Sequence, residues 1–91
     1  MEYEWDLEKD RINQQLHGVS FAEASTVFLD PLQATVPDDR FEYDEFRFRT
    51  IGYTVANRLV IVAHAERHDR IRIITARGVT PKERRQYEQQ S

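Results

Sequence analysis

The first apolar positions of the chain recur with a helical spacing. Ile12 and Leu16 lie four residues apart, so they share one face of a helix. Asp6 belongs to the residue types that favour the position just before a helix, and Gly18 to those that favour the left-handed position just after one. The pattern therefore predicts a helix over residues 7–17.

A second, shorter helix is predicted over residues 21–28. Ser20 and Glu23 have the spacing of a capping box, in which the serine accepts a backbone hydrogen bond and the glutamate reaches back. Ala24 and Phe28 continue its apolar face. Pro31 ends this helix, because proline disfavours helical geometry in the residue before it.

The middle of the chain carries three runs that are rich in β-branched residues, at residues 46–53, 59–66 and 70–77. The connections between them are short, which predicts neighbouring antiparallel strands. Residues 59–63 are apolar throughout and are expected in the central strand. Residues 32–36 are predicted to form a short edge strand, and residues 37–44 an acidic loop.

The last helix is predicted to begin at Pro81 and to continue for about ten residues, because Thr80, Pro81 and Glu83 combine a cap, a proline in the first turn and a capping box. Two helices thus precede the strands and one follows them. The predicted fold class is α+β, with helices around an antiparallel meander of three to four strands. A chain of 91 residues is expected to form one domain, residues 1–91.

Charge is distributed unevenly along the chain. Residues 1–46 contain 12 Asp and Glu against 3 Lys and Arg, whereas residues 47–91 contain 4 against 10. The net charge of −3 argues against nucleic-acid binding by the molecule as a whole. A local basic field in the second half is nevertheless able to attract RNA, and chance asymmetry of solvated charges is the alternative.

The chain contains no cysteine, which excludes disulfides and cysteine-based zinc sites. No apolar run approaches the roughly 20 residues of a membrane-spanning helix. The N-terminal residues are acidic, whereas a secretory signal peptide begins with basic ones. These features predict a cytoplasmic protein that does not contact a membrane.

Six segments follow one another in an order and spacing that are specific together. They are YEWDLEK at residues 3–9, Asn13 followed by HGVSF at 17–21 with Ala24, FLDP at 28–31, RTIG at 49–52, ERHDRIRIITAR at 66–77, and KERR at 82–85 with Tyr87. In these segments the chain resembles the BrnT toxins of type II toxin–antitoxin systems.

The resemblance implies a compact fold similar to that of RelE-type toxins, and a ribonuclease activity that arrests growth. It also implies a cognate antitoxin with a ribbon-helix-helix DNA-binding part, in a heterotetramer or larger complex that contacts DNA only through the antitoxin. The sequence departs from the family pattern at Leu16, where a lysine is usual, and at Gly78, where a second basic residue is common. Both departures remove a positive charge.

RNA cleavage without a metal needs a base for the 2′-hydroxyl proton, cations for the charge on the phosphorane, and an acid for the leaving oxygen. The carboxylates and histidines do not have the spacing of a metal site, so no metal or other cofactor is expected. The cations are sought among four arginines of the last predicted hairpin: Arg67, Arg70, Arg72 and Arg77. Arg70 and Arg72 share a strand face, whereas Arg77 has the opposite parity unless a bulge intervenes.

The catalytic candidates are Lys9, His17, Glu66, Arg67 and Arg77. Glu66 precedes the hairpin turn, where a structural ion pair with a neighbouring arginine is the alternative. His17 titrates near neutrality, although a histidine also suits the C-terminal end of a helix. Lys9 is placed on the helix face that carries His17, either to contact a phosphate or assist proton transfer, or in solvent paired with a nearby carboxylate.

The RNA-binding candidates are Arg70, Arg72, Lys82, Arg85, Trp5 and Tyr87. Trp5 and Tyr87 have rings that stack on bases, or that pack inside the fold. His64 falls in the central strand and is expected to be structural, whereas His68 is expected in a solvated turn.

Two other functions compete with a ribonuclease. One is a degenerate toxin-like module that only binds an antitoxin and serves operon autoregulation, for which the two lost charges argue. The other is direct DNA binding by this chain, which no predicted helix supports with a basic recognition face.

Overall fold

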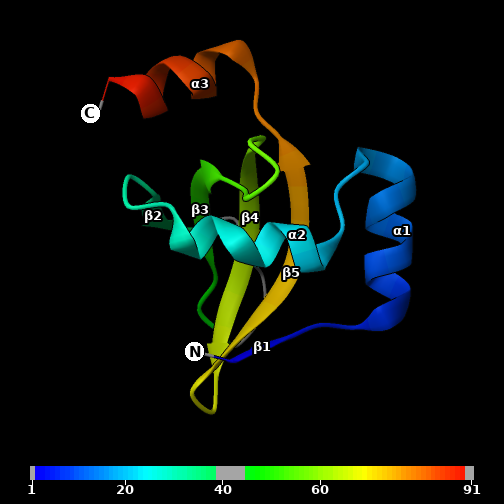
Figure 1. Ribbon diagram of the computed structural model, residues 1–91. Helices are drawn as coiled ribbons and strands as arrows, with labels where there is room; N and C mark the ends of the chain where they lie inside the picture. Colours follow the sequence, from blue (N-terminus) through cyan, green and yellow to red (C-terminus); the bar gives the residue numbers. More distant parts are fainter. Residues whose placement is uncertain (1, 39–44, 90–91) are drawn as a thin grey trace.

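The computed structural model describes residues 2–38 and 45–89 and is an α+β protein. Along the chain it contains β1 (Glu2–Glu4), α1 (Leu7–His17), α2 (Phe21–Ala24), the 3₁₀ helix η1 (Ser25–Leu29), β2 (Ala34–Pro37), β3 (Phe48–Tyr53), β4 (Leu59–Arg67), β5 (Arg70–Gly78) and α3 (Pro81–Glu88). Figure 1 shows α2 crossing the sheet, α1 beside β5 and α3 at the end of the sheet where β5 ends.

The sheet has five strands in the order β1-β5-β4-β3-β2, and it is mixed. β2 to β5 pair antiparallel, as the short connections predict, whereas β1 pairs parallel with β5. The prediction of a purely antiparallel meander of three to four strands was therefore wrong in detail. β1 has only three residues, too few for an alternating pattern, and its partner is Arg70–Arg72 at the other end of the sequence.

Local signals place the helix ends. The Asp6 side chain accepts hydrogen bonds from two backbone N–H groups of α1, and Gly18 ends that helix with a φ of 69°. The predicted helix over residues 21–28 is instead four α-helical residues followed by η1. The hydroxyls of Ser25 and Thr26 donate to carbonyls three residues earlier, which accompanies the tighter winding. α3 starts with the predicted capping box at Thr80.

The strand bounds differ by a few residues from those predicted. The edge strand β2 starts at Ala34 and reaches Pro37, and β3 starts at Phe48. His68 and Asp69 both have positive φ angles, as in the two-residue turns that suit the twist of a hairpin. Most of the acidic loop predicted at residues 37–44 lies outside the described residues.

The hydrophobic core lies on the face of the sheet that α2 and η1 cover, called here the inner face. Val60 and Val62 of β4 and Ile73 of β5 are almost fully buried there. Phe21 of α2 and Val27 of η1 pack onto them with no exposed surface. Burial of each of these large side chains stabilises the fold by about 1.5–3 kcal/mol.

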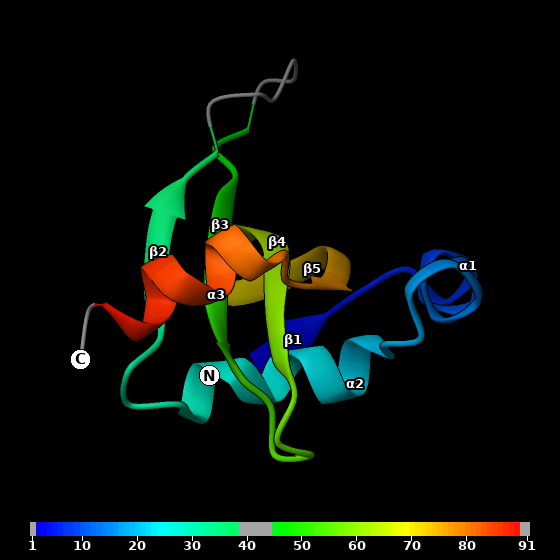
Figure 2. The same ribbon diagram turned by 90° about the horizontal axis from the view of Figure 1, so that it is seen from above.

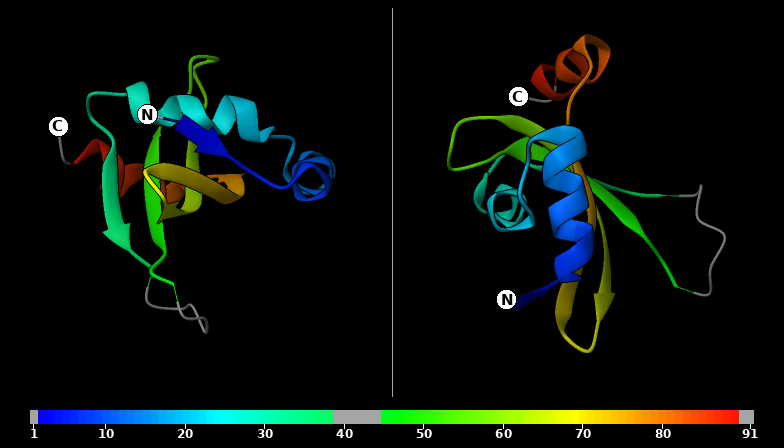
Figure 3. Two further views of the ribbon diagram at one scale, coloured as in Figure 1. Left: turned by 90° about the horizontal axis from the view of Figure 1, so that it is seen from below. Right: turned by 90° about the vertical axis from the view of Figure 1, so that its right-hand side faces the viewer.

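α1 runs alongside β5 beyond the point where β1 stops (Figure 3). Asn13 is 5% exposed and joins the two elements, since its amide donates to the Val19 and Ala76 carbonyls. Its side-chain oxygen accepts from the Ala76 N–H. Asn13 thus replaces a neighbouring strand at this edge, which satisfies backbone groups that would otherwise be buried unpaired.

A β-bulge in β5 changes which side chains share a face. Ala63 pairs with Thr75 and His64 with Ile73, so Ile74 is an extra residue. Because paired residues point to the same side of a sheet, Arg72 opposite Ala65 and Arg77 opposite Ile61 lie on one face. This is the face opposite α2, called here the outer face. α3 covers one end of it (Figure 2).

Candidate functional site

A polar hollow of about 350 Å³ lies where the N-terminal end of α1 meets β5. Its charged lining consists of Asp6, Lys9, Arg47 and Arg72, and we call it the cationic hollow. One oxygen of Asp6 accepts from the Glu8 and Lys9 backbone N–H groups at 2.8 and 3.0 Å. The Lys9 ammonium has no ion-pair or hydrogen-bond partner among the described residues, so it is available to a ligand.

Glu45 connects the two arginines of the cationic hollow. It forms an ion pair and a hydrogen bond with Arg72, and its Oε1 lies 3.6 Å from Arg47 Nε. The three side chains are half-buried, with 29% exposure for Arg72 and 31% for Glu45. Arg72 Nε is buried and has no hydrogen-bond partner among the described residues. Arg72 therefore keeps one donor unused by the fold beside this carboxylate.

The sequence interpretation missed Glu45, Arg47 and Arg49. Their signal was present as the alternating run EFRFR at residues 45–49, in which charged and aromatic positions occupy opposite parities. The connection before β3 carries Glu45 and Arg47 to the hollow, and the strand itself places Arg49 on the outer face.

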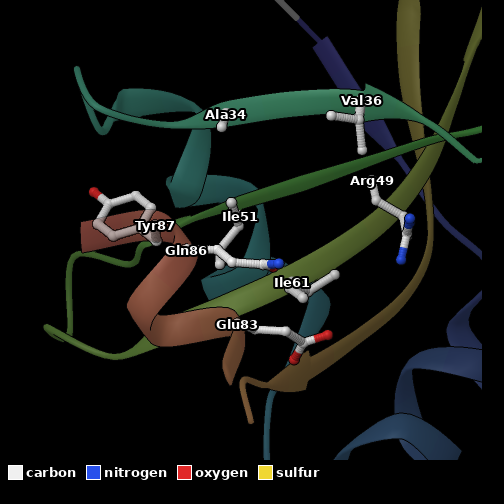
Figure 4. A pocket seen from close by; sticks show the side chains of 8 residues that line it. All are labelled: Ala34, Val36, Arg49, Ile51, Ile61, Glu83, Gln86 and Tyr87. Atoms are coloured by element: carbon white, nitrogen blue, oxygen red, sulfur yellow. The ribbon is translucent and has the colours of Figure 1, made fainter. Parts of the chain in front are cut away.

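A smaller groove of about 160 Å³ lies between α3 and the outer face, called here the α3 groove (Figure 4). Its sheet side is lined by Ala34, Val36, Ile51 and Ile61, and its remaining lining comes from Arg49, Glu83, Gln86 and Tyr87. Arg49 Nε is buried without a hydrogen-bond partner among the described residues.

Arg77 holds the start of α3 rather than joining the cationic hollow. Its Nη1 and Nη2 donate to the two carboxylate oxygens of Glu83, each at 2.9 Å. The hydrogen bonds from Arg77 lower the pKa of Glu83 to about 2, and the same pairing raises the pKa of Arg77. Both groups therefore stay charged near neutral pH and fix α3 to the end of β5.

The hairpin turn between β4 and β5 carries another group of predicted residues: Glu66, Arg67 and Arg70, with His68. All four are exposed, which agrees with the solvated position expected for His68. Arg70 pairs with Glu2 at 3.2 Å. The ion pair of Glu66 with Arg67 or Arg70, which was the alternative to a catalytic role, is not formed, and Glu66 has no partner among the described residues. The late-hairpin arginines thus divide between three places.

The polar residues Lys9, Asn13 and His17, which are spaced by four along α1, also lie in different environments. Lys9 and His17 line one groove between α1 and β5, together with Ile12 and Leu16, whereas Asn13 between them is buried. Eight helical residues separate Lys9 from His17, a rise of about 12 Å, so they do not share the cationic hollow. Leu16 is 71% exposed in this groove.

Trp5 and Tyr87 have structural contacts. The Trp5 ring packs edge-on against Phe21, with centroids 6.3 Å apart. The buried Tyr87 donates from its hydroxyl to Asp30 Oδ2 at 2.6 Å, and burial together with Asp30 raises the pKa of Tyr87 to about 12. Lys82 and Arg85 are exposed on α3.

His64 has the structural position expected for it. It is 5% exposed on the inner face, between the rings of Phe28 and Phe48, and its Nε2 lies 2.7 Å from Thr50 Oγ1. Burial lowers the pKa of His64 to about 4. It is therefore neutral at physiological pH and lies on the face away from the cations.

The described residues contain neither a candidate metal-ion site nor a helix suited to span a membrane. Within residues 2–38 and 45–89, no group of three or more His, Cys, Asp or Glu side chains is placed to hold a metal ion. None of the described helices has both the length and the apolar composition needed to cross a bilayer.

The chain is similar to known proteins both in sequence, through a family model, and in fold, through a solved structure. A family model described as the ribonuclease toxin, BrnT, of type II toxin–antitoxin systems matches residues 5–83. Among solved structures, the crystal structure of the Brucella abortus ribonuclease toxin BrnT is similar with a TM-score of 0.69. The match has 19% identity and covers 88% of this chain and 97% of that one, which shows a shared fold. None of the curated proteins matches the chain.

Proposed function

Because the chain belongs to the BrnT family of ribonuclease toxins of type II toxin–antitoxin systems, we propose that it cleaves RNA in the cationic hollow without a metal ion. The proposal rests on one hollow that is lined by Lys9, Arg47 and Arg72, in which the half-buried Arg47 and Arg72 both lie beside the carboxylate of Glu45. Family membership supports the substrate, and the hollow supports the position.

The two guanidinium groups supply the electrostatic part of the reaction. Arginine binds phosphate oxygens through a planar fork of donors, and a partly water-excluded site strengthens this attraction. Arg72 and Arg47 reach the hollow from β5 and from the segment before β3, so a phosphodiester between them is held from two sides. Negative charge that builds up on the phosphorane is stabilised by the same groups.

Glu45 and Lys9 supply the proton transfers. Glu45 accepts the proton of the 2′-hydroxyl, and the 2′-oxygen forms a bond to phosphorus. The bond from phosphorus to the 5′-oxygen breaks, and Lys9 donates a proton to that oxygen. The products are a 2′,3′-cyclic phosphate and a 5′-hydroxyl, and no metal takes part in a step.

The test is cleavage of a labelled RNA by purified chain verified to be free of any partner, in excess EDTA. Cleavage with a 2′,3′-cyclic phosphate end is expected, and added magnesium is expected not to raise the rate. Glu45→Gln is expected to lower the rate by about 100-fold, within the usual range for a general base. Lys9→Met is expected to have an effect of similar size.

Glu66→Gln is the matched control, since Glu66 is a carboxylate at the far hairpin turn with no partner among the described residues. Its rate is expected to stay within about twofold of the unmodified chain, which is the scatter typical of exposed positions. Activity that EDTA abolishes contradicts the metal-free mechanism. A large loss in Glu66→Gln with none in Glu45→Gln places the base at the turn instead.

A type II toxin has a protein antitoxin as its partner, and we place that contact along α1. Ile12 and Leu16 are 40% and 71% exposed there, and both line the apolar groove beside β5. We propose that the antitoxin carries a ribbon-helix-helix part, forms a heterotetramer or larger complex with this chain, and makes the DNA contacts. Expression separates a live toxin from a degenerate antitoxin-binding module, because only the former arrests growth when expressed alone.

A further inference from the structure

The α3 groove has an apolar floor with a regular construction. Ala34 of β2, Ile51 of β3 and Ile61 of β4 are paired across neighbouring strands, so their side chains form one row on the outer face. Ile51 and Ile61 are paired on neighbouring strands, and in the view of Figure 4 the Gln86 side chain lies between them. Three aliphatic side chains in a row offer a flat surface, which suits a planar ring.

The rim of the groove offers donors and acceptors that the fold does not use. Arg49 makes no hydrogen bond or ion pair with any described residue, and its Nε is buried. The Gln86 amide has no partner among the described residues either. Glu83 Oε1 accepts from Arg77 and from the Thr80 N–H, whereas Oε2 accepts from Arg77 alone and retains a lone pair.

We propose that the α3 groove binds one base of the RNA, and that this base is guanine. This rests on the proposed function and names the position that selects the sequence to be cut. Arg49 presents the paired donors that match the O6 and N7 acceptors of guanine. Glu83 Oε2 and the Gln86 amide oxygen are acceptors for the N–H groups on the opposite side of the ring.

The groove lies next to the cationic hollow along one strand direction. Arg47 lines the hollow, whereas Arg49 and Ile51 line the groove. These three residues follow one another along the chain at intervals of two. Two strand residues span about 6.6 Å, which is the backbone spacing from Arg47 to Arg49, so one RNA strand that crosses the outer face is able to contact both sites. The groove thus reads a base near the scissile bond.

The size and chemistry of the groove favour a base over a peptide segment. Its volume of about 160 Å³ is below the roughly 300–1,000 Å³ of sites for drug-sized ligands, so it fits one ring system. Adenine places an amino group beside N7, and cytosine an amino group at N4, so each turns a donor toward the Arg49 donors.

The test is a titration of the unmodified chain with each of the four nucleoside 5′-monophosphates, followed by NMR through the Ile51 and Ile61 methyl groups. Guanosine monophosphate is expected to shift both methyl signals and to bind at least about tenfold more tightly than the other three. Inorganic phosphate is expected to shift the NMR signals of residues that line the cationic hollow and to leave the Ile51 and Ile61 methyl signals unchanged.

Arg49→Lys retains the charge but removes the fork of donors, so it is expected to weaken guanosine monophosphate binding about tenfold and to leave adenosine monophosphate unaffected. Gln86→Leu is expected to weaken guanosine monophosphate binding less than Arg49→Lys does. Gln15→Leu, the same change at an exposed position of α1, is the matched control and is expected to bind normally. The methyl spectrum itself verifies that each variant is folded.

Equal binding of all four monophosphates, methyl groups that respond to none of them, or unchanged selectivity in Arg49→Lys would overturn the proposal. Because the titration requires no cleavage, it is independent of the Glu45→Gln experiment. Selective guanine binding without metal-free cleavage refutes the proposed function alone, and cleavage without base selectivity refutes this inference alone.

Discussion

The two faces of one sheet differ in what they do with polar groups. At the sheet edge beside the inner face, Asn13 has every polar atom paired with backbone groups. On the inner face, the buried His64 is held neutral, and its Nδ1 has no hydrogen-bond partner among the described residues. On the outer face, Arg49 and Arg72 are half-buried with unused donors. The unpaired polar atom of the inner face thus belongs to a neutral ring, whereas those of the outer face belong to charged guanidinium groups, which suit an anionic ligand.

Stability and chemistry are therefore carried by separate sets of residues within the same strands. β5 contributes Ile71 and Ile73 to the core, whereas Arg72 between them reaches the cationic hollow. Because successive strand residues point to opposite faces, one strand serves both purposes. Substitutions on the two faces are therefore expected to have separable effects.

The largest effect is expected for Arg72→Ala. The loss of one donor group that stabilises charge in a transition state slows catalysis by about 10²–10³-fold. Arg70→Ala is the matched change two residues away on the same face, at an exposed arginine that pairs only with Glu2 among the described residues. Single-turnover cleavage of one RNA by both variants is the measurement. Equal losses in the two variants would contradict a localised site.

Asn13→Ala is expected to destabilise the edge of the sheet where α1 meets β5. It leaves the Val19 carbonyl and both backbone groups of Ala76 without their partner, at a total cost of about 3 kcal/mol in the free energy of unfolding. Urea denaturation measures it, with Gln15→Ala on the exposed side of α1 as the control. Cleavage per folded molecule is expected to be unchanged.

Acid is expected to weaken the inner face through His64. Its pKa is about 4 in the folded protein and about 6.5 when unfolded, so between these values the unfolded chain binds more protons and stability falls as the pH falls. Protonation of His64 in the unfolded chain thus lowers the free energy of unfolding by up to about 3 kcal/mol in acid. Urea denaturation at pH 7, 6 and 5 is expected to show this slope.

His64→Asn is the control for that slope, since it keeps a polar side chain near Thr50 but does not titrate. Its stability is expected to be lower at pH 7 and to change less down to pH 5. The pKa of Glu83 is about 2, so this carboxyl titrates below the window in both proteins. An identical slope in the two proteins would show that another group is responsible.

The smallest effect is expected for Tyr87→Phe, which removes the hydrogen bond from Tyr87 to Asp30. A bond to a charged acceptor contributes about 1.5–3 kcal/mol, and the remaining burial of the ring is retained. Faster amide hydrogen exchange confined to α3 is expected, because Tyr87 is the buried residue of that helix. Tyr3→Phe, at a ring stacked on Phe28, is the comparison.

The parts of the fold that depend on neighbouring residues were predictable. The caps at Asp6 and Thr80 act within one turn of chain, and the sequence places both helix starts correctly. β1 was not predictable, because it pairs three residues with a strand near the far end of the chain. The bulge at Ile74 leaves no mark in the hydrophobic pattern, although it decides the face of Arg77.

The candidate site was predictable only in part. The period of two in β5 indicates that Arg70 and Arg72 share a face, but not that Arg72 meets Lys9 while Arg70 pairs with Glu2. The position of Glu45 depends on how the segment before β3 returns to β5, a contact between distant segments. Tyr87 has a ring suited to stacking on bases, and only its contact with Asp30 indicates a structural role.

The separation of stability from chemistry is tested most directly by comparing Arg72→Ala with Asn13→Ala. Two quantities are measured for each variant: the rate of RNA cleavage per folded molecule in EDTA, and the free energy of unfolding. Arg72→Ala is expected to be stable and nearly inactive, and Asn13→Ala is expected to be unstable and fully active once folded. An Arg72→Ala protein that cleaves at the unmodified rate would contradict this separation.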